Sequence, residues 1–235
     1  MNVASRTHIG LVRASNQDAL LLCPGKYDLY GVADGMGGHK AGDIASLMAV
    51  TLLRRFISDA RPSKDRFRRA IEETNLMIYE EQLYRPDLSG MGTTLTAIWE
   101  DKKHILLGHV GDSRAYRMRN GQISQVSQDH SMVAELVRDG LISPEEARKH
   151  PYRNIITRAL GADETVEADV EELDKRPGDL YLICSDGLSE YVYEDRMQKI
   201  LSENSLEDAA DQLLNLALEG GGGDNVSLVL AEVTA

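Results

Sequence analysis

Apolar residues occur in short runs separated by polar and glycine-containing segments, a pattern typical of β-strands joined by turns. One boundary between such runs, Arg119-Asn120-Gly121, is a hairpin-turn signal, because Asn and Gly readily adopt the left-handed backbone conformation of a tight turn. The pattern predicts strands at residues 7–11, 19–23, 27–33, 93–99, 104–110, 114–118, 122–126, 166–173, 179–184 and 226–233.

Other segments repeat their apolar residues at the three- and four-residue spacing of an amphipathic helix. In residues 41–60 this stripe consists of Ile44, Leu47, Met48, Leu52 and Phe56. A capping box is predicted where Ser143 precedes Pro144 and Glu146. The pattern predicts helices at residues 41–60, 64–83, 131–139, 144–149, 194–202 and 205–218.

The order of these elements predicts the fold class. Helices follow one another in pairs and strands follow one another in runs, which favours antiparallel sheets covered by helix pairs over the alternation of a parallel sheet. We therefore expect an α+β fold. A length of 235 residues is compatible with one domain of this kind and no linker-like segment divides the chain, so residues 1–235 are expected to form a single domain.

Charge and cysteine content limit the partners and the compartment. The chain has 26 Lys and Arg against 38 Asp and Glu, a formal net charge of −12, which argues against nucleic acid and anionic membranes, because both bind cationic surfaces. Its two cysteines form no CxxC pair, so neither a disulfide framework nor a zinc knuckle is indicated. With no signal-peptide pattern and no apolar run of membrane-spanning length, we expect a cytoplasmic monomer.

Aspartates beside apolar strands are the main chemical signal. Asp34, Asp112, Asp186 and Asp224 each adjoin a small residue at the end of a predicted strand. A single Asp-Gly pair usually marks a surface turn, and an acidic surplus alone is explained by solubility. Four carboxylates brought together by strand ends would repel one another unless they are protonated or bind cations. Oxygen ligands without a cluster of His or Cys indicate Mg²⁺ or Mn²⁺ rather than zinc.

The glycine-rich run at residues 35–40 does not match the common phosphate-binding loops. It lacks the Gly-Lys-Ser/Thr of a P-loop, and Lys40 stands where a dinucleotide-binding loop has its third glycine. The chain contains neither an EF-hand loop nor the Gly-x-Ser-x-Gly of serine hydrolases. None of these signatures therefore accounts for the glycine-rich run.

In their order along the chain, several segments resemble the motifs of the protein phosphatase 2C (PPM) family, in its compact bacterial form. They are Gly10 to Asp18, Val32-Ala33-Asp34-Gly35-Met36-Gly37-Gly38-His39, Ser89 to Thr94, Gly108 to Arg114, Ser185-Asp186-Gly187-Leu188 and Gly223-Asp224-Asn225. The resemblance extends from about residue 7 to residue 233. It implies a metal-dependent serine/threonine phosphoprotein phosphatase whose two antiparallel sheets pack face to face between helix pairs, in the order α-β-β-α.

The resemblance also implies a centre with two Mn²⁺ or Mg²⁺ ions. Asp34 would bridge both ions, and the backbone carbonyl of Gly35 would bind one of them. Asp186 and Asp224 would hold the other ion.

Further roles follow from the same resemblance. Asp112 together with Asp186 would hold a third, weaker ion, and Asp18 would act through metal-bound water. Residues 129–160 resemble the mobile flap that borders the cleft in this family. The two histidines of this segment, His130 and His150, are expected to be solvated.

Two positions depart from the family pattern. Met36 replaces a histidine that many eukaryotic members carry, so His39 becomes the candidate proton donor, although capping the helix that follows is an equal alternative. Gln17 replaces a glutamate of many members, and its amide can hydrogen-bond metal-bound water but cannot accept the proton of that water.

The implied mechanism is direct hydrolysis of phosphoserine and phosphothreonine. A water held between two cations loses its proton near neutral pH and attacks phosphorus, so no covalent phosphoenzyme forms. Arg13 is expected to grip the phosphoryl oxygens, because a planar guanidinium fits them in a two-pronged geometry. Without the resemblance, Arg13 would be interpreted as a surface cation paired with an acid.

The partners implied by the family are phosphorylated proteins and a eukaryotic-like Ser/Thr kinase that this phosphatase opposes. One alternative is a catalytically silent binding module of the same fold, which the presence of all four aspartates disfavours. Another alternative is a hydrolase of small phosphoesters, for which a deep, closed pocket would be expected.

Overall fold

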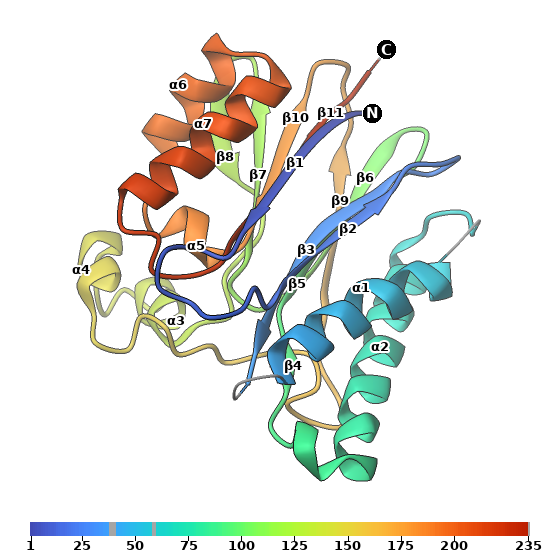
Figure 1. Ribbon diagram of the computed structural model, residues 1–235. Coiled ribbons are helices and arrows are strands. Elements are labelled where there is room, and N and C mark those ends of the chain that lie inside the picture. The colour runs from blue at the N-terminus through green and yellow to red at the C-terminus, as the bar shows by residue number, and fades with distance from the viewer. Residues whose placement is uncertain (38–40, 58–59, 235) are drawn as a thin grey trace.

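The computed structural model describes residues 1–37, 41–57 and 60–234, and its strands form two antiparallel sheets (Figure 1). The first sheet has the order β1 (Asn2–His8), β11 (Val226–Glu232), β10 (Leu180–Cys184), β7 (Arg114–Arg119) and β8 (Gln122–Gln125). The second has the order β2 (Asp18–Cys23), β3 (Leu29–Met36), β5 (Leu95–Glu100), β6 (His104–Val110) and β9 (Asp169–Asp174), with the short β4 (Gly92–Thr93) also paired to β3.

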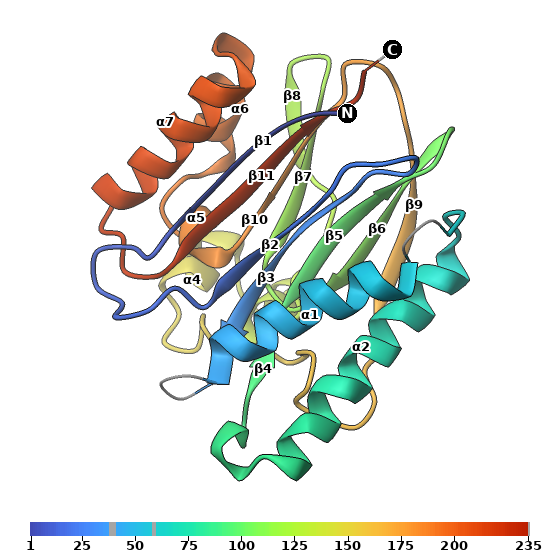
Figure 2. The same ribbon diagram turned by 45° about the vertical axis from the view of Figure 1, so that its right-hand side comes forward.

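The two sheets pack face to face through apolar side chains that alternate along each strand. On β10, Tyr181 and Ile183 point into the layer between the sheets, whereas Leu182 and Cys184 pack on the other side against helices. The same two-residue period places Val229 of β11 between the sheets and Leu230 beneath the helices. Figure 2 shows the resulting layers.

Helix pairs cover both outer faces of the sandwich (Figure 2). Against the second sheet lie α1 (Ala41–Ile57) and α2 (Lys64–Tyr84), which the short η1 (Pro86–Leu88) follows. Against the first sheet lie α5 (Asp186–Ser189), α6 (Glu194–Glu203) and α7 (Leu206–Glu219). Two short helices, α3 (Met132–Arg138) and α4 (Pro144–Lys149), lie in the 129–160 segment. None of the helices in the described part of the chain is long and apolar enough to span a membrane.

The predicted fold class is confirmed: two antiparallel sheets are flanked by helices in the order α-β-β-α. Two local predictions are also confirmed. Ser143 and Glu146 form the predicted capping box at the start of α4, and Asn120 adopts the left-handed conformation (φ 53°) in the turn between β7 and β8.

Some predicted boundaries were wrong. The first strand is β1 (Asn2–His8) rather than residues 7–11, because the chain bends away after His8 and the Leu11 N–H bonds to the Gly222 carbonyl at 2.7 Å. Residues 166–168 precede β9 and pair with no strand. The predicted strand at 93–99 is divided at Thr94, and α5 and η1 were not predicted.

Candidate metal centre

The predicted site residues meet at one edge of the sandwich, where strands of both sheets end. Asp18 and Asp34 face each other directly across the β2–β3 pair, although like charges at opposed positions of a sheet are unfavourable. Asp34 lies within β3, and its backbone is held on both sides. Its N–H donates to the Thr94 hydroxyl at 3.0 Å, and its carbonyl accepts the Thr94 N–H at 2.8 Å.

The backbone next to Asp34 is packed too tightly for a side chain. A Cβ at Gly35 would lie 2.0 Å from the Gly42 carbonyl oxygen and 2.6 Å from that of Gln17, so only glycine fits. The Gly35 N–H donates to the Gln17 carbonyl at 3.1 Å. The motif around Asp34 is therefore a rigid junction of β3, α1 and the segment that leads into β2.

Asp186 reaches the same edge from the first sheet. It starts α5 directly after β10, with Ser185 at the N-cap. The Ser185 hydroxyl donates to Asp18 at 2.8 Å and accepts the Ser227 N–H at 3.0 Å. This serine therefore links β10, β11 and β2 beneath the carboxylates.

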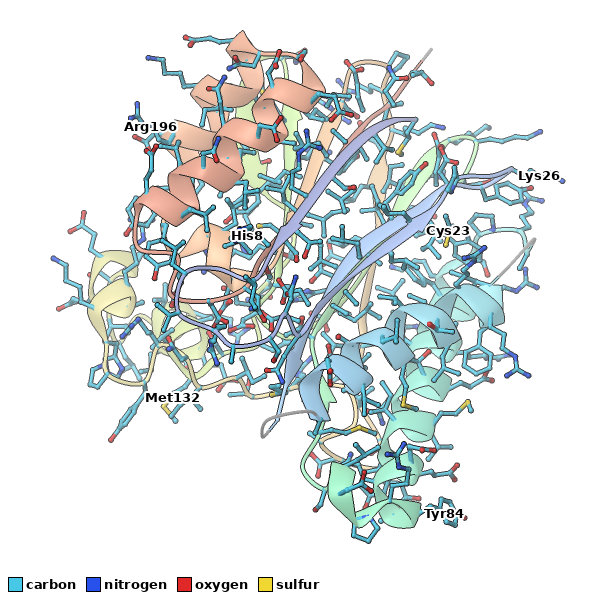
Figure 3. The ribbon with its side chains drawn as sticks, viewed as in Figure 1. His8, Cys23, Lys26, Tyr84, Met132 and Arg196 are labelled. Carbon is cyan, nitrogen blue, oxygen red and sulfur yellow. The ribbon has the colours of Figure 1, made fainter. Side chains whose placement is uncertain are left out.

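Arg13 and Asp224 form an ion pair at the rim of the site. The Arg13 Nη2 lies 2.6 Å from the Asp224 Oδ2, and the Arg13 side chain is 51% exposed. The loop that carries Arg13 leaves β1 at His8, which Figure 3 labels, and the His8 Nδ1 accepts the Gly10 N–H at 2.9 Å. The loop thus presents a cation beside the carboxylates.

Asn225 holds this loop in place. Its amide nitrogen donates to the carbonyls of Ile9 (2.9 Å) and Ser15 (3.0 Å), and its amide oxygen accepts the Gln17 N–H at 2.7 Å. Both the donors and the acceptor of one side chain are used, so Asn225 positions the segment that joins β1 to β2. The sequence motif around Asp224 includes Asn225 but does not predict the hydrogen-bond partners of its side chain.

The carboxylates of the site carry more negative charge than their surroundings balance. Burial away from water raises the pKa of Asp34 well above its usual value, and the negative charges of Asp18 and Asp186 raise it further. Burial also raises the pKa of Asp186 well above its usual value, with further contributions from the charges of Asp112 and Asp224. Loss of water also raises the pKa values of Asp18 and Asp112, each to about 6.

Two carboxylate oxygens of the site are buried without a hydrogen-bond partner among the described residues: Asp18 Oδ1 and Asp186 Oδ1. Buried polar atoms are rarely left unpaired, so these oxygens indicate a missing positive partner. No three acidic, His or Cys side chains in the described ranges already enclose an ion position. An open arrangement of a few carboxylates nevertheless fits Mg²⁺ or Mn²⁺, because hard cations keep several water ligands.

A pocket of about 500 Å³ extends from the carboxylates outward. Its lining includes Asp112 and Asp186 of the site, Val133 and Ala147 of the 129–160 segment, and Tyr193. Arg148 and Arg153 of this segment approach Glu194 (3.6 Å) and Glu190 (3.7 Å). These ion pairs are exposed and contribute little to stability.

The structure thus brings together the predicted residues Arg13, Asp18, Asp34, Asp112, Asp186 and Asp224, with Gly35 beside Asp34. The predicted proton donor, His39, lies outside the described residues. One expectation was wrong: His130 is only 4% exposed rather than solvated. Sequence reasoning did not single out Thr94 and Ser185, whose partners come from distant strands.

The sequence profile described as protein phosphatase 2C matches residues 7–220. The serine/threonine protein phosphatase PstP of Mycobacterium tuberculosis is 41% identical over 99% of this chain, which spans 45% of the length of that relative. The serine/threonine phosphatase stp of Listeria welshimeri is 40% identical, over 99% of this chain and 96% of that protein.

Solved structures resemble the whole described fold. The crystal structure of the Mycobacterium tuberculosis phosphatase PstP superposes with a TM-score of 0.92 at 40% identity, covering 100% of this chain and 99% of the other. The catalytic domain of PstP in complex with 2 manganese ions superposes with a TM-score of 0.90 at 39% identity, covering 100% and 98%.

Proposed function

The chain belongs to the protein phosphatase 2C family, and from this premise we propose that it is a metal-dependent serine/threonine phosphoprotein phosphatase. The observation that carries the proposal is the group of carboxylates at the sandwich edge. Their raised pKa values and the unpaired oxygens of Asp18 and Asp186 are explained if divalent cations are part of the working site.

We assign the ion ligands as the family pattern suggests. Asp34 would serve two core ions, with the Gly35 carbonyl on one of them and Asp186 and Asp224 on the other. Asp112 would share a third, weaker ion with Asp186. The manganese ions in the structure of the PstP catalytic domain support Mn²⁺ as one of the usable metals. When bound, the core ions supply positive charge to the phosphoryl oxygens and acidify the water that attacks phosphorus.

Asp18 would act through water rather than on an ion directly. Its Oδ2 accepts the Ser185 hydroxyl at 2.8 Å, which leaves Oδ1 buried and free to accept a hydrogen bond from a water molecule. Asp18 lies opposite Asp34 in the β2–β3 pair, and its charge acts on the Asp34 carboxylate. Asp18 therefore orients water beside the core ions in this proposal.

Arg13 would bind the phosphoryl group. In the structure it donates one hydrogen bond to Asp224, and its half-exposed guanidinium has further N–H groups for phosphoryl oxygens. As water adds to phosphorus, the bond to the serine or threonine oxygen breaks, and this oxygen must gain a proton. His39 stays the predicted donor of that proton, with helix capping as the alternative.

The pocket beside the carboxylates supports a polypeptide substrate. Its lining includes Asp112 and Asp186 as well as Tyr193, a residue that is 44% exposed, so a chain can lie along it with the phosphoryl group beside the two aspartates. We propose that the 129–160 segment is a flap that forms one wall of this pocket. Substrates would be proteins phosphorylated by a Ser/Thr kinase, and the two free cysteines support a cytoplasmic location.

Metal removal and return test the proposed activity. Hydrolysis of a phosphothreonine peptide and of p-nitrophenyl phosphate is measured after EDTA treatment and again with Mn²⁺ or Mg²⁺. We expect activity on both substrates to disappear and to return. Full activity of the metal-free protein would contradict the proposal. Activity confined to small phosphoesters would favour a small-molecule hydrolase.

A further inference from the structure

Besides the exposed ion pairs of Arg148 and Arg153, hydrogen bonds at both of its ends attach the 129–160 segment to the rest of the molecule. We name residues 129–131 the first root and residues 156–160 the second root. The His130 N–H of the first root donates to the Gly111 carbonyl at 2.7 Å. In the second root, Leu160 exchanges two backbone hydrogen bonds with Thr93, at 2.8 and 3.0 Å.

Each root therefore bonds to a residue that is linked to an aspartate of the site. Gly111 directly precedes Asp112, and the Thr93 hydroxyl donates to the Asp34 carbonyl at 2.9 Å. The roots are also bonded to each other, because the Thr157 N–H donates to the His130 carbonyl at 2.8 Å. The segment is thus tied to the candidate metal centre through two short connections.

The imidazole of His130 adds a side-chain connection at the first root. Its Nδ1 accepts the Gly111 N–H at 3.1 Å, so this nitrogen carries no proton in the bonded state. The other nitrogen, Nε2, lies 3.2 Å from the Asp169 carboxylate and donates to it. Arg158 of the second root donates to the same carboxylate at 3.2 Å. The two ring nitrogens of His130 therefore face different groups: Nδ1 faces Gly111, and Nε2 faces Asp169 together with the Arg158 Nη1 at 3.3 Å.

A second buried histidine packs beside this ring. The rings of His109 and His130 lie 4.8 Å apart between their centroids. His109 is bonded to the Thr96 hydroxyl (2.9 Å) and the Gln128 carbonyl (3.0 Å). Burial lowers the pKa of both rings, that of His109 to about 4, which keeps them uncharged and preserves the acceptor nitrogen of His130.

Gly111 has little freedom to find another partner. Its φ of +109° is a conformation that favours glycine, and a Cβ there would lie 2.6 Å from Thr94. Its N–H is buried against the His130 ring. Loss of the acceptor would leave this donor unpaired, and the simplest relief is a movement of the Gly111–Asp112 backbone toward water.

We propose that His130 is a positioning residue for Asp112, and that through its two ring nitrogens it couples the position of the first root to that of the Asp112 carboxylate. The inference rests on the proposed function, since Asp112 is taken there as a ligand of the weaker ion. A histidine that only fills space would need neither nitrogen in particular. Because each ring nitrogen makes its own bond, a substitution can remove one bond and keep the other.

Two substitutions separate the bonds made by the two ring nitrogens. In His130→Asn the side-chain amide oxygen replaces the Nδ1 acceptor, whereas in His130→Gln the longer side chain places its amide near Nε2. The readouts are hydrogen–deuterium exchange of the Gly111 amide, Mn²⁺ titration by calorimetry, and kcat and KM on p-nitrophenyl phosphate. We expect His130→Gln to lose protection of the Gly111 amide and to weaken the weakest Mn²⁺ binding by roughly 10-fold or more. His130→Asn should retain most of both.

His150 supplies a matched control. Its Nδ1 accepts the Tyr152 N–H at 3.2 Å at the end of α4, a bond of the same kind within its own turn. His150→Asn and His150→Gln should leave the exchange of Gly111 and the Mn²⁺ titration unchanged.

Equal effects of His130→Asn and His130→Gln, limited to thermal stability, would overturn the proposal, as would a protected Gly111 amide in His130→Gln. If neither variant folds, Asp169→Asn tests the Nε2 side alone. It should partly lower the protection of Gly111, and unchanged protection would contradict the coupling. Absence of phosphatase activity in the unsubstituted protein would instead refute the proposed function, whereas the exchange of Gly111 would still report on His130.

Discussion

The two ends of strand β10 carry aspartates in opposite electrostatic situations. Asp179, which precedes the strand, is 1% exposed, accepts two bonds of 2.6 Å from Arg119 and accepts the Arg176 N–H at 2.8 Å. Asp186, which follows the strand, is half-buried, and its Oδ1 has no partner among the described residues. One carboxylate is satisfied by the protein, and the other is surrounded by further carboxylates.

The neighbours of these residues follow the same division. At the Asp179 end, Arg119 and Arg176 lower the pKa of Asp174 by hydrogen bonds and charge. At the Asp186 end, Arg13 bonds to Asp224, and the pKa values of Asp34 and Asp186 are nevertheless raised. The net charge of −12 cannot distinguish these ends, because it counts charges without their partners. Carboxylates that are not balanced by nearby cations, rather than a large number of acidic residues, mark the place where a metal ion is needed.

The largest effect is expected from Asp34→Asn. Because Asp34 is proposed to serve both core ions, the rate of phosphopeptide hydrolysis should fall roughly 10³-fold or more in Mn²⁺. Asp112→Asn, which affects only the weaker ion, should cost less, roughly 10–100-fold. Steady-state kinetics with circular dichroism as a folding control provide the test. Equal losses in two folded variants would argue against the ligand assignment.

At the other end of β10, Asp179→Asn should damage folding rather than chemistry. The substitution leaves Arg119 without its nearest carboxylate, and breaking a buried ion pair costs about 3 kcal/mol of unfolding free energy. The activity of the folded fraction should stay unchanged, because Asp179 is remote from the proposed site. Urea unfolding and kinetics on the same preparation would check this. A loss of less than about 0.5 kcal/mol would mean that the ion pair at this end adds no stability.

Arg13 is the cation at the acidic end, and its replacement should affect phosphate binding. Arg13→Ala removes a charge-assisted contact of about 1.5–3 kcal/mol, so we expect KM for a phosphopeptide to rise roughly 10–100-fold. Arg13→Lys keeps the charge but not the planar fork, and it should recover only part of the loss. Inhibition by free phosphate gives an independent measure. Unchanged inhibition in Arg13→Ala would return Arg13 to the role of a surface cation.

The smallest effect is the pH dependence of stability without metal. The pKa values of Asp18 and Asp112 rise from 3.8 to about 6 on folding, so the folded state binds more protons than the unfolded state between these pH values. Stability should therefore fall as pH rises from 5 to 7, by roughly 1–3 kcal/mol. Urea unfolding in EDTA at pH 5 and pH 7 measures this slope. A rise in stability over the same range would be incompatible with the raised pKa values.

The sequence predicted much of the fold and most of the candidate site, because motif order identifies residues even where their surroundings are unknown. It did not predict that Asp34 lies inside β3. The strand β4 beside it is only two residues long, too short to show the periodicity of a strand in the sequence. The short helix that begins at Asp186 was missed for the same reason.

Long-range contacts were the other source of error. His130 was expected to be solvated, yet it is buried against Gly111, which lies 19 residues earlier in the chain. Ser185 was not singled out, although its hydroxyl bonds to Asp18 across 167 residues. No local pattern reports such partners, because they depend on how the two sheets meet.

Thermal unfolding of Asp34→Asn and of the unsubstituted protein, in EDTA and in Mn²⁺, measures whether the carboxylates at this edge destabilise the fold until cations neutralise them. In EDTA, Asp34→Asn should melt at the same or a higher temperature, because an amide then faces Asp18, and Mn²⁺ should raise the Tm of the unsubstituted protein much more than that of the variant. A lower Tm of Asp34→Asn in EDTA, with an equal gain from Mn²⁺ in both proteins, would contradict the account.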